Sequence, residues 1–247
     1  MLDGEAYRGA APPRPVQIDG CLLPEDRLYD LEHDVWFRAD ESRGTARVGL
    51  LGPLVWFAGP FRSVTYRDLN GPVARGRSVA TVESVRYTGA VRLPVGGEVV
   101  ERNPAIVERP RLLNDAPYDE GWVVRIRPVT REPSLAALET ASAIASRLAE
   151  RIRVQRIRCW PQTPDLELYE IGIECSAILT MLNEELRERP AGTAVLLVTD
   201  DPTSPIEMVR WADQTGHRLL ATRREADLYQ FLVRKEARPV PRRRSPA

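Results

Sequence analysis

Cys175 stands at the start of a predicted helix, where a thiol can be a reactive nucleophile. The segment CSAILTMLNEELR, residues 175–187, is predicted to be that helix. A thiol in the first turn of a helix lies near unpaired backbone N–H groups and the positive end of the helix dipole, and both favour the thiolate. Cys175 is therefore a candidate reactive thiol, and the alternative is a half-buried structural cysteine.

The chain has two further cysteines, Cys21 and Cys159. Three cysteines are too few for a disulfide framework, and their spacing fits no zinc site, so we expect no metal. Cys159 is a possible second thiol that could resolve Cys175 if the intervening segment folds back, which would give direct redox chemistry. For Cys21 and Cys159 themselves a structural role is favoured.

Lysine chemistry is almost absent from this chain. Lysine and arginine together number 35, and Lys235 is the single lysine among them. A guanidinium stays protonated and is a poor nucleophile, so amide-forming modification has one candidate side chain. Lys235 is predicted inside the last strand and not at a loop tip, which argues against a carrier role for it.

Two histidines and two neighbouring carboxylates are assigned architectural roles. His33 precedes a predicted strand without a carboxylate–histidine–nucleophile pattern around it. Asp200 and Asp201 stand where a strand should turn into a helix, and His217 follows the end of that helix.

Composition limits the classes of partner and compartment. The 247 residues carry 35 basic and 35 acidic side chains, and this balance argues against a nucleic-acid partner held by a broad basic field. No apolar run approaches the ~20 residues that span a bilayer, and the N-terminus does not look like a secretory signal. We expect a cytoplasmic protein with no membrane partner.

The first half of the chain reads as β structure, and the pattern then changes to a helix. Glycine and proline separate short segments of branched and aromatic residues, which is typical of a small barrel or sandwich. The predicted strands are 35–38, 45–51, 63–68, 78–85, 91–93, 97–101 and 122–126. A short helix is predicted over 104–108, and an amphipathic helix with a Ser134 cap over 134–152.

The second half predicts the order β-α-β-α-β-β. Its strands are 166–171, 194–199, 218–222 and 229–234, and its helices are 175–187 and 204–213, the second with a capping box at Ser204 to Glu207. The expected domains are a flexible N-terminus 1–16, a β domain 17–130, a helical linker 131–164, an α/β domain 165–237 and a disordered basic tail 238–247.

Residues 78–103 resemble the H protein of the glycine cleavage system. That family carries a lipoyl-lysine hairpin of the form V-E-S-V-K-A followed by P-V-S-G-E-V-V-E-x-N. The chain reads VESVR at 82–86 and PVGGEVVERN at 94–103. The likeness covers about residues 22–128 and implies a barrel-sandwich hybrid with a modified lysine at a hairpin tip.

Arg86 occupies the position of that lysine. Arginine keeps the charge and reach of lysine but cannot form the lipoyl amide, so we expect no lipoyl cofactor. The resemblance then implies a barrel that survives as an unmodified docking domain, with Arg86 as an exposed turn residue.

Residues 165–236 resemble the TusA family of sulfur carriers. The likeness rests on Gly172 to Cys175, on VLLVTDDP at 195–202, on Trp211 and on FLVRK at 231–235. It implies a persulfide-carrying cysteine in a two-layer α/β sandwich. The family's Cys-Pro-x-Pro is here Cys-Ser-Ala-Ile at 175–178, so the two prolines that stiffen the turn are missing.

The sequence therefore predicts an α+β protein of two domains, a mainly β barrel-sandwich hybrid followed by a β-α-β-α-β-β sandwich. The predicted function is a non-enzymatic sulfur-relay accessory protein, at most a sulfurtransferase, in which Cys175 carries the sulfur and the barrel docks onto a protein partner. The alternative is a non-lipoylated H-protein paralogue that acts as a scaffold for glycine-cleavage or lipoate-handling enzymes.

Overall fold

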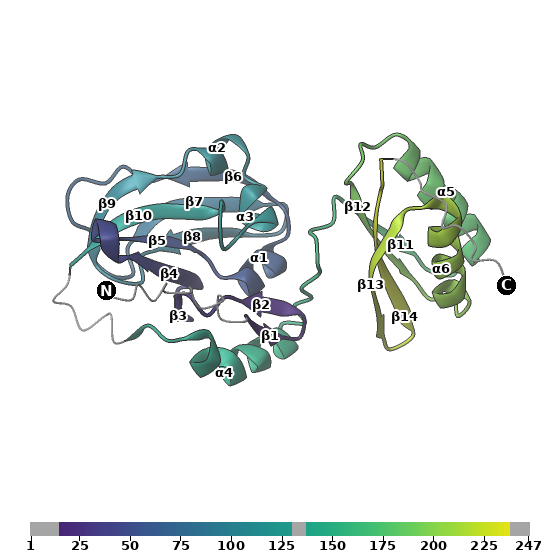
Figure 1. Cartoon of the computed structure of the whole chain (residues 1–247), viewed down its shortest axis with the longest axis horizontal. Helices are drawn as coiled ribbons and strands as arrows, with labels where there is room; N and C mark the ends of the chain where they lie inside the picture. The colour runs from purple at the N-terminus through teal and green to yellow at the C-terminus, as the bar shows by residue number, and fades with distance from the viewer. Residues whose placement is uncertain (1–14, 130–136, 238–247) are drawn as a thin grey trace, which may run out of the picture. The chain divides into compact units, whose positions relative to one another are not determined.

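The computed structural model describes residues 15–129 and 137–237, which fall into two compact units divided between Cys159 and Trp160 (Figure 1). The flexible ends and the Ser134 cap expected from the sequence lie outside the described residues, apart from residues 15 and 16. Across the described ranges, no helix is long and apolar enough to cross a membrane.

The two larger sheets of the first unit share one apolar core. The five-stranded sheet has the order β3 (Leu28–Asp30), β4 (Val35–Asp40), β5 (Thr45–Leu50), β10 (Trp122–Pro128) and β9 (Gly97–Arg102), with antiparallel neighbours. The three-stranded sheet joins β6 (Phe61–Tyr66), β7 (Ser78–Ser84) and β8 (Thr88–Arg92). Buried side chains from both sheets belong to one hydrophobic cluster. The predicted mainly β domain is confirmed, and its sheets do not close into a barrel.

Strand β4 shows how the two-residue period serves two separate cores. Val35 and Phe37 lie in the core between the sheets, while Trp36 points the other way into a second cluster. Gly49 pairs with Trp36 across the sheet, and a Cβ added to Gly49 would lie 2.5 Å from the indole ring. The indole therefore needs glycine at this register position.

The helix predicted as a linker belongs to the first unit. Helix α4 runs over Ala141–Val154 and is capped by Thr140, whose side chain accepts the Ala143 N–H. Its apolar stripe is buried in the second cluster together with the hairpin of β1 (Val16–Ile18) and β2 (Cys21–Leu23). The stripe follows the predicted spacing, but the helix begins at 141, because Glu139 forms a β-bridge with Tyr29 and Thr140 is extended.

Several short elements of the first unit were not expected. These are α1 (Gly52–Ala58), α3 (Leu112–Asp115), the 3-10 turn η1 (Glu41–Arg43) and strands β1 to β3. The predicted short helix is present as α2 (Ala105–Glu108). Helix α1 is apolar on nearly every side and shorter than two periods of a helical pattern, so its sequence reads equally as the end of strand β5.

The second unit has the predicted order and forms a two-layer sandwich. Its sheet has the order β11 (Leu166–Glu170), β12 (Ala194–Thr199), β14 (Leu228–Arg234) and β13 (Arg218–Glu225), with only the β11–β12 pair parallel. Helices α5 (Cys175–Arg187) and α6 (Ser204–Thr215) cover one face of the sheet (Figure 1). On β13, Arg223 stacks on the buried ring of Trp160, with 4.6 Å from its guanidinium carbon to the ring centroid.

Candidate functional site

Arg86 lies in the turn between β7 and β8 and is exposed, as predicted. Its backbone N–H donates to the Ser84 hydroxyl at 3.3 Å, and that hydroxyl donates to the Ala58 carbonyl at 2.7 Å. Gly59 has φ 73°, and a Cβ added there would lie 2.9 Å from a guanidinium nitrogen of Arg86. The Arg86 guanidinium therefore lies against the C-terminal end of α1, where a cation is favoured.

This turn does not fit a lipoyl group. Forming the lipoyl amide needs a neutral amine, and Arg86 offers only a protonated guanidinium. The next residue, Tyr87, packs edge-on against Phe57 and Phe61 with ring centroids 6.4 and 6.5 Å away, which fixes this side of the turn.

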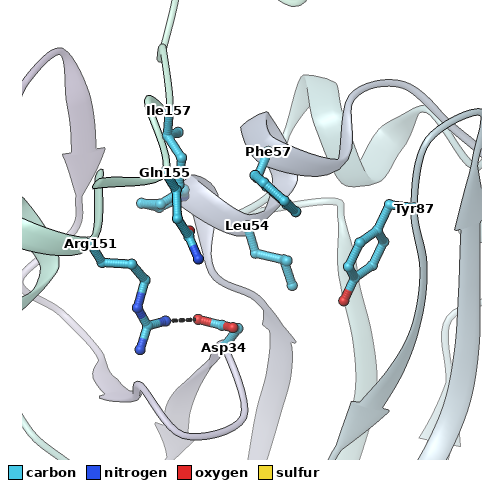
Figure 2. A pocket seen from close by; sticks show the side chains of 8 residues that line it. Asp34, Leu54, Phe57, Tyr87, Arg151, Gln155 and Ile157 are labelled. Atoms are coloured by element: carbon cyan, nitrogen blue, oxygen red, sulfur yellow. Dashed lines mark hydrogen bonds and ion pairs between the residues drawn. The ribbon is translucent and has the colours of Figure 1, made fainter. Parts of the chain in front are cut away.

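A pocket of about 160 Å³ opens beside Tyr87 (Figure 2). Leu54 and Phe57 of α1 line it together with Asp34 and with Arg151 of α4, and the Arg151 guanidinium forms an ion pair with the Asp34 carboxylate. Burial raises the pKa of Asp34, although Arg151 opposes the shift. Asp34 also has φ 53°, which is rare outside glycine and asparagine-like residues.

The single lysine is engaged in the architecture of the second unit. Lys235 follows β14, one residue beyond the strand in which it was predicted. Its ammonium group donates to the carbonyls of Leu186, Arg187 (3.1 Å) and Arg189 (2.6 Å), at the C-terminus of α5. Lys235 thus supplies the cation that stabilises the negative end of the helix on which Cys175 lies.

Cys175 is the first residue of α5, so the predicted helix start is confirmed. The residue is buried, with 4% of its surface exposed. Among the described residues it is the one free cysteine. The preceding Glu174 is the N-cap, and its side chain makes no capping hydrogen bond.

The surroundings of Cys175 oppose a thiolate. Burial is the main cause that raises the pKa of Cys175 to about 11, and the carboxylates of Asp201 and Glu207 raise it further, while a hydrogen bond with Thr203 lowers it. This shift is opposite in direction to the one expected from a helix N-terminus, because desolvation and the two nearby carboxylates disfavour the anion.

Asp201 joins the starts of the two helices. Its Oδ2 accepts the Cys175 N–H at 2.7 Å, and its Oδ1 accepts the N–H and the hydroxyl of Thr203 at 2.7 and 2.6 Å. The Thr203 side chain is the main cause that lowers the pKa of Asp201, so this carboxylate is ionised. Asp201 is 26 residues from Cys175, and no sequence pattern signalled their contact.

The turn between β12 and α6 forms differently from the predicted capping box. Thr203, and not Ser204, is the N-cap of α6, and its side chain makes no capping bond. The buried hydroxyl of Ser204 has no hydrogen-bond partner among the described groups. Asp201 bonds Thr203 within this turn, whereas Asp200, one residue earlier, accepts the Gly172 N–H of the loop before α5 at 2.8 Å, so both carboxylates have architectural roles.

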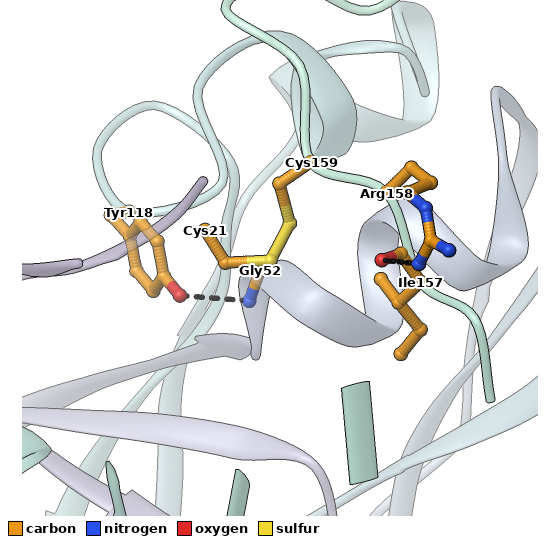
Figure 3. Close-up of a disulfide and its surroundings, with 6 residues drawn as sticks. All are labelled: Cys21, Gly52, Tyr118, Ile157, Arg158 and Cys159. Carbon is orange, nitrogen blue, oxygen red and sulfur yellow. Dashed lines mark hydrogen bonds between the residues drawn. A yellow bond between two sulfur atoms is a disulfide. The ribbon is translucent and has the colours of Figure 1, made fainter. Parts of the chain in front are cut away.

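Cys159 is bonded to Cys21 and so cannot resolve Cys175 (Figure 3). The two half-cystines are 138 positions apart in sequence, with their Cα atoms 4.9 Å apart, and both are buried in the cluster around α4. The proposed Cys159–Cys175 redox pair is therefore corrected, and Cys21, which had no predicted companion, has one. Strand β2 and the end of the first unit meet here because both flank α4, which the linker interpretation did not anticipate.

The histidines have structural surroundings. His33 pairs with Asp30 through Nδ1 at 2.8 Å, and Arg75 bridges Asp30 and Glu32 at 3.1 and 2.8 Å. Because Arg75 already neutralises these carboxylates, the cluster of Asp30, Glu32 and His33 is a poor cation site although its ligand atoms lie within 4.8 Å. His217 accepts the Glu236 N–H at 3.3 Å, and burial lowers its pKa.

Comparison with known proteins assigns a family to each unit. The sequence model of the glycine cleavage H-protein matches residues 27–151, and that of the sulfurtransferase TusA matches residues 170–235. The glycine cleavage system H protein 2 of Aquifex aeolicus is 35% identical over 57% of this chain and 86% of its own length. A probable glycine cleavage system H protein 2 of Sulfurisphaera tokodaii is 33% identical over 58% of this chain and 97% of its own. A crystal structure of an H protein from Mycobacterium marinum, 29% identical, covers 51% of this chain and 98% of its own with a TM-score of 0.45.

Proposed function

This chain belongs to the glycine cleavage H-protein family, with a TusA domain following the H-protein domain, and from that premise we propose that it is a sulfur-relay accessory protein. Cys175 carries a persulfide sulfur, and the H-protein unit is an unmodified docking domain for a protein partner of a sulfur-relay or lipoate and glycine-cleavage system. We place this activity in the cytoplasm.

The free thiol at the first residue of α5 carries the proposal. The other two cysteines are consumed by the disulfide, and the one amine is held by three carbonyls. Cys175 is thus the thiol that remains free for sulfur transfer in the TusA domain.

The transfer step balances without an oxidant or a reductant. The Cys175 sulfur attacks the outer sulfur of a donor persulfide, R–S–SH, and forms a new S–S bond. The donor S–S bond breaks, the donor leaves as R–SH, and one proton moves from Cys175 to the departing sulfur. With a pKa of about 11, about one Cys175 in ten thousand is a thiolate at neutral pH, so uptake depends on a change around this sulfur.

Arg86 and Lys235 support the unmodified docking domain. The expected lipoyl position has no acylable amine, and the Lys235 ammonium is bonded at the end of α5. We propose that the protein carries no lipoyl group, and intact-mass measurement of protein from cells that lipoylate other proteins tests this. A lipoyl adduct on any residue contradicts the proposal.

The sulfur-carrier proposal is tested by persulfide loading of the full chain. Incubation with a cysteine desulfurase and cysteine should add about 32 Da, one sulfur atom, to Cys175. The matched variant Cys175→Ser keeps the size and polarity of the site and should gain nothing. An unmodified wild-type protein, or an equal gain in Cys175→Ser, would falsify the carrier role.

The burial of Cys175 favours a second candidate function, a non-lipoylated H-protein paralogue that acts as a scaffold. In that case a glycine-cleavage or lipoate-handling enzyme should bind wild type and Cys175→Ser equally in a purified binding assay. If neither class of enzyme binds the protein, the scaffold function is contradicted.

A further inference from the structure

We propose that Asp201 gates Cys175: its carboxylate holds the first amide of α5 and keeps the neighbouring sulfur protonated until a cationic group of the transfer partner draws Asp201 away. This inference rests on the proposed carrier function and concerns the regulation of that same site. The proposal requires that Asp201 lie where the helix N-termini favour an anion and that its carboxylate be ionised. It also requires that α5 still begin at Cys175 when the charge of Asp201 is removed.

The starts of α5 and α6 both present N–H groups to Asp201. The Cys175 N–H reaches Oδ2 at 2.7 Å, and the Thr203 N–H reaches Oδ1 at 2.7 Å. The N-termini of helices are the places where fixed N–H groups and the helix dipole favour an anion. Here the anion at that position is the Asp201 carboxylate, so a Cys175 thiolate would have to form beside an existing negative charge.

Among the described residues, the charged groups that shift the pKa of Cys175 are both acidic. Asp201 and Glu207 both disfavour the thiolate, and the remaining influence is the neutral Thr203 side chain. Glu207 is already paired with Arg210 at 2.6 Å, whereas the described groups that donate to Asp201 are the neutral N–H groups of Cys175 and Thr203 and the Thr203 hydroxyl. Asp201 is therefore the carboxylate for which an incoming guanidinium or ammonium group is the matching chemistry.

The turn can lose the Asp201 charge and keep one of its two accepting oxygens. An asparagine at 201 can accept either the Thr203 N–H or the Cys175 N–H, but not both, because its amide nitrogen only donates. Asp200 provides a matched control, because it is the adjacent carboxylate and accepts the Gly172 N–H at 2.8 Å, yet it is not among the groups that shift Cys175.

The test is alkylation of the Cys175 thiol by iodoacetamide in the full chain under non-reducing conditions. At about pH 8, Asp201→Asn should react roughly tenfold faster than wild type, with the midpoint of its pH profile about one unit lower. Asp200→Asn should react at the wild-type rate. Equal rates in wild type and Asp201→Asn, or equal acceleration in both variants, overturn the gate.

A second arm tests release by a cation. A tetra-arginine peptide at low ionic strength should accelerate alkylation of the wild type and leave Asp201→Asn unchanged, while tetra-glutamate accelerates neither. No acceleration of the wild type, or equal acceleration of both proteins, overturns release by a cationic partner. Thermal melting of each variant separates a faster reaction from partial unfolding, since an open gate leaves the melting temperature near that of wild type.

Alkylation needs no sulfur donor, so the gate and the carrier role fail separately. If Asp201→Asn alkylates faster but takes up no sulfur from the desulfurase, the gate stands and the carrier role is refuted. If both proteins load sulfur and alkylate at one rate, the carrier role stands and the gate is refuted.

Discussion

Cys175 holds its proton more tightly in the folded protein than in the unfolded chain, because its sulfur is buried beside Asp201. Folding raises the pKa of this thiol from 9.0 to about 11. Above pH 9 the unfolded chain loses the proton first, so the unfolded state binds fewer protons and the free energy of unfolding falls as pH rises. Below pH 9 both states keep the proton, and the contribution does not change.

We therefore expect Cys175→Ser to remove part of the alkaline loss of stability. Denaturant unfolding from about pH 8 to about pH 10.5 measures this loss. The free energy of unfolding should fall more steeply with pH in wild type than in Cys175→Ser. Raised tyrosine pKa values, such as that of Tyr66 at about 12, are common to both proteins and cancel in the difference. An equal fall of the free energy of unfolding with pH in the two proteins would mean that folding does not raise the pKa of Cys175.

Lys235 illustrates a residue whose role depends on its tertiary partners. From the sequence it is the one amine of the chain, and the structure assigns it to the C-terminus of α5 through three carbonyls. Lys235→Met keeps the length of the side chain and removes the charge and donors. We expect it to lower the free energy of unfolding by about 1–3 kcal/mol. Denaturant unfolding of Lys235→Met and Lys235→Arg provides the measurement, and the arginine variant should retain part of the stability. If both variants are as stable as wild type, Lys235 does not stabilise the end of α5.

At the scale of elements, the disulfide closes the layer around α4. It joins β2 to the last residue of the first unit across 138 positions, so it removes much of the freedom of the unfolded chain. Cys21→Ser/Cys159→Ser should lower the free energy of unfolding by about 3–5 kcal/mol. A reductant should lower the stability of wild type by a similar amount and leave the double variant unchanged. If the reductant affects both proteins alike, the loss does not come from this bond.

The bounds of an element could be predicted where the residues within and directly beside it determine where it begins and ends. The strand at 194–199 and the helix at 175–187 were predicted with the bounds that the structure has, because a continuous apolar strand and a helix between Glu174 and Arg187 are read locally. The apolar stripe of α4 predicted its buried face through Ile144, Leu148 and Ile152 but not the surface that covers it. That surface is the β1–β2 hairpin and the outer face of Trp36, far away in sequence.

The candidate site divides in the same way. The position of Cys175 followed from the helix pattern of one segment, and that of Arg86 from the resemblance of residues 82–103 to the H-protein hairpin. The state of Cys175 did not, because it depends on Asp201, which arrives from the turn after β12. The Cys21–Cys159 bond likewise depends on how α4 docks, and no spacing rule joins two cysteines 138 positions apart.

At the scale of the whole molecule, the position of α4 decides where the chain can be divided. If 131–164 were a linker, the H-protein unit would be complete at residue 130. The structure instead buries Ala141, Ile144, Leu148 and Ile152 in the first unit and divides the chain after Cys159. Removal of α4 would expose the apolar partners of that stripe, including Tyr29 and Trp36, which are buried in the full chain.

Two fragments distinguish these boundaries. A fragment ending at Cys159 keeps the helix and the disulfide, and it should unfold in one cooperative transition with dispersed amide resonances. A fragment ending at residue 137 loses both, and it should bind a hydrophobic dye and lack that transition, because a face built to be covered is then open to water. The fragment 160–247, measured alongside, should keep its own transition, since within residues 15–129 and 137–237 its core cluster includes nothing before Ile173 other than β11. A stable, cooperative fragment ending at residue 137 would restore the helix to the role of a linker.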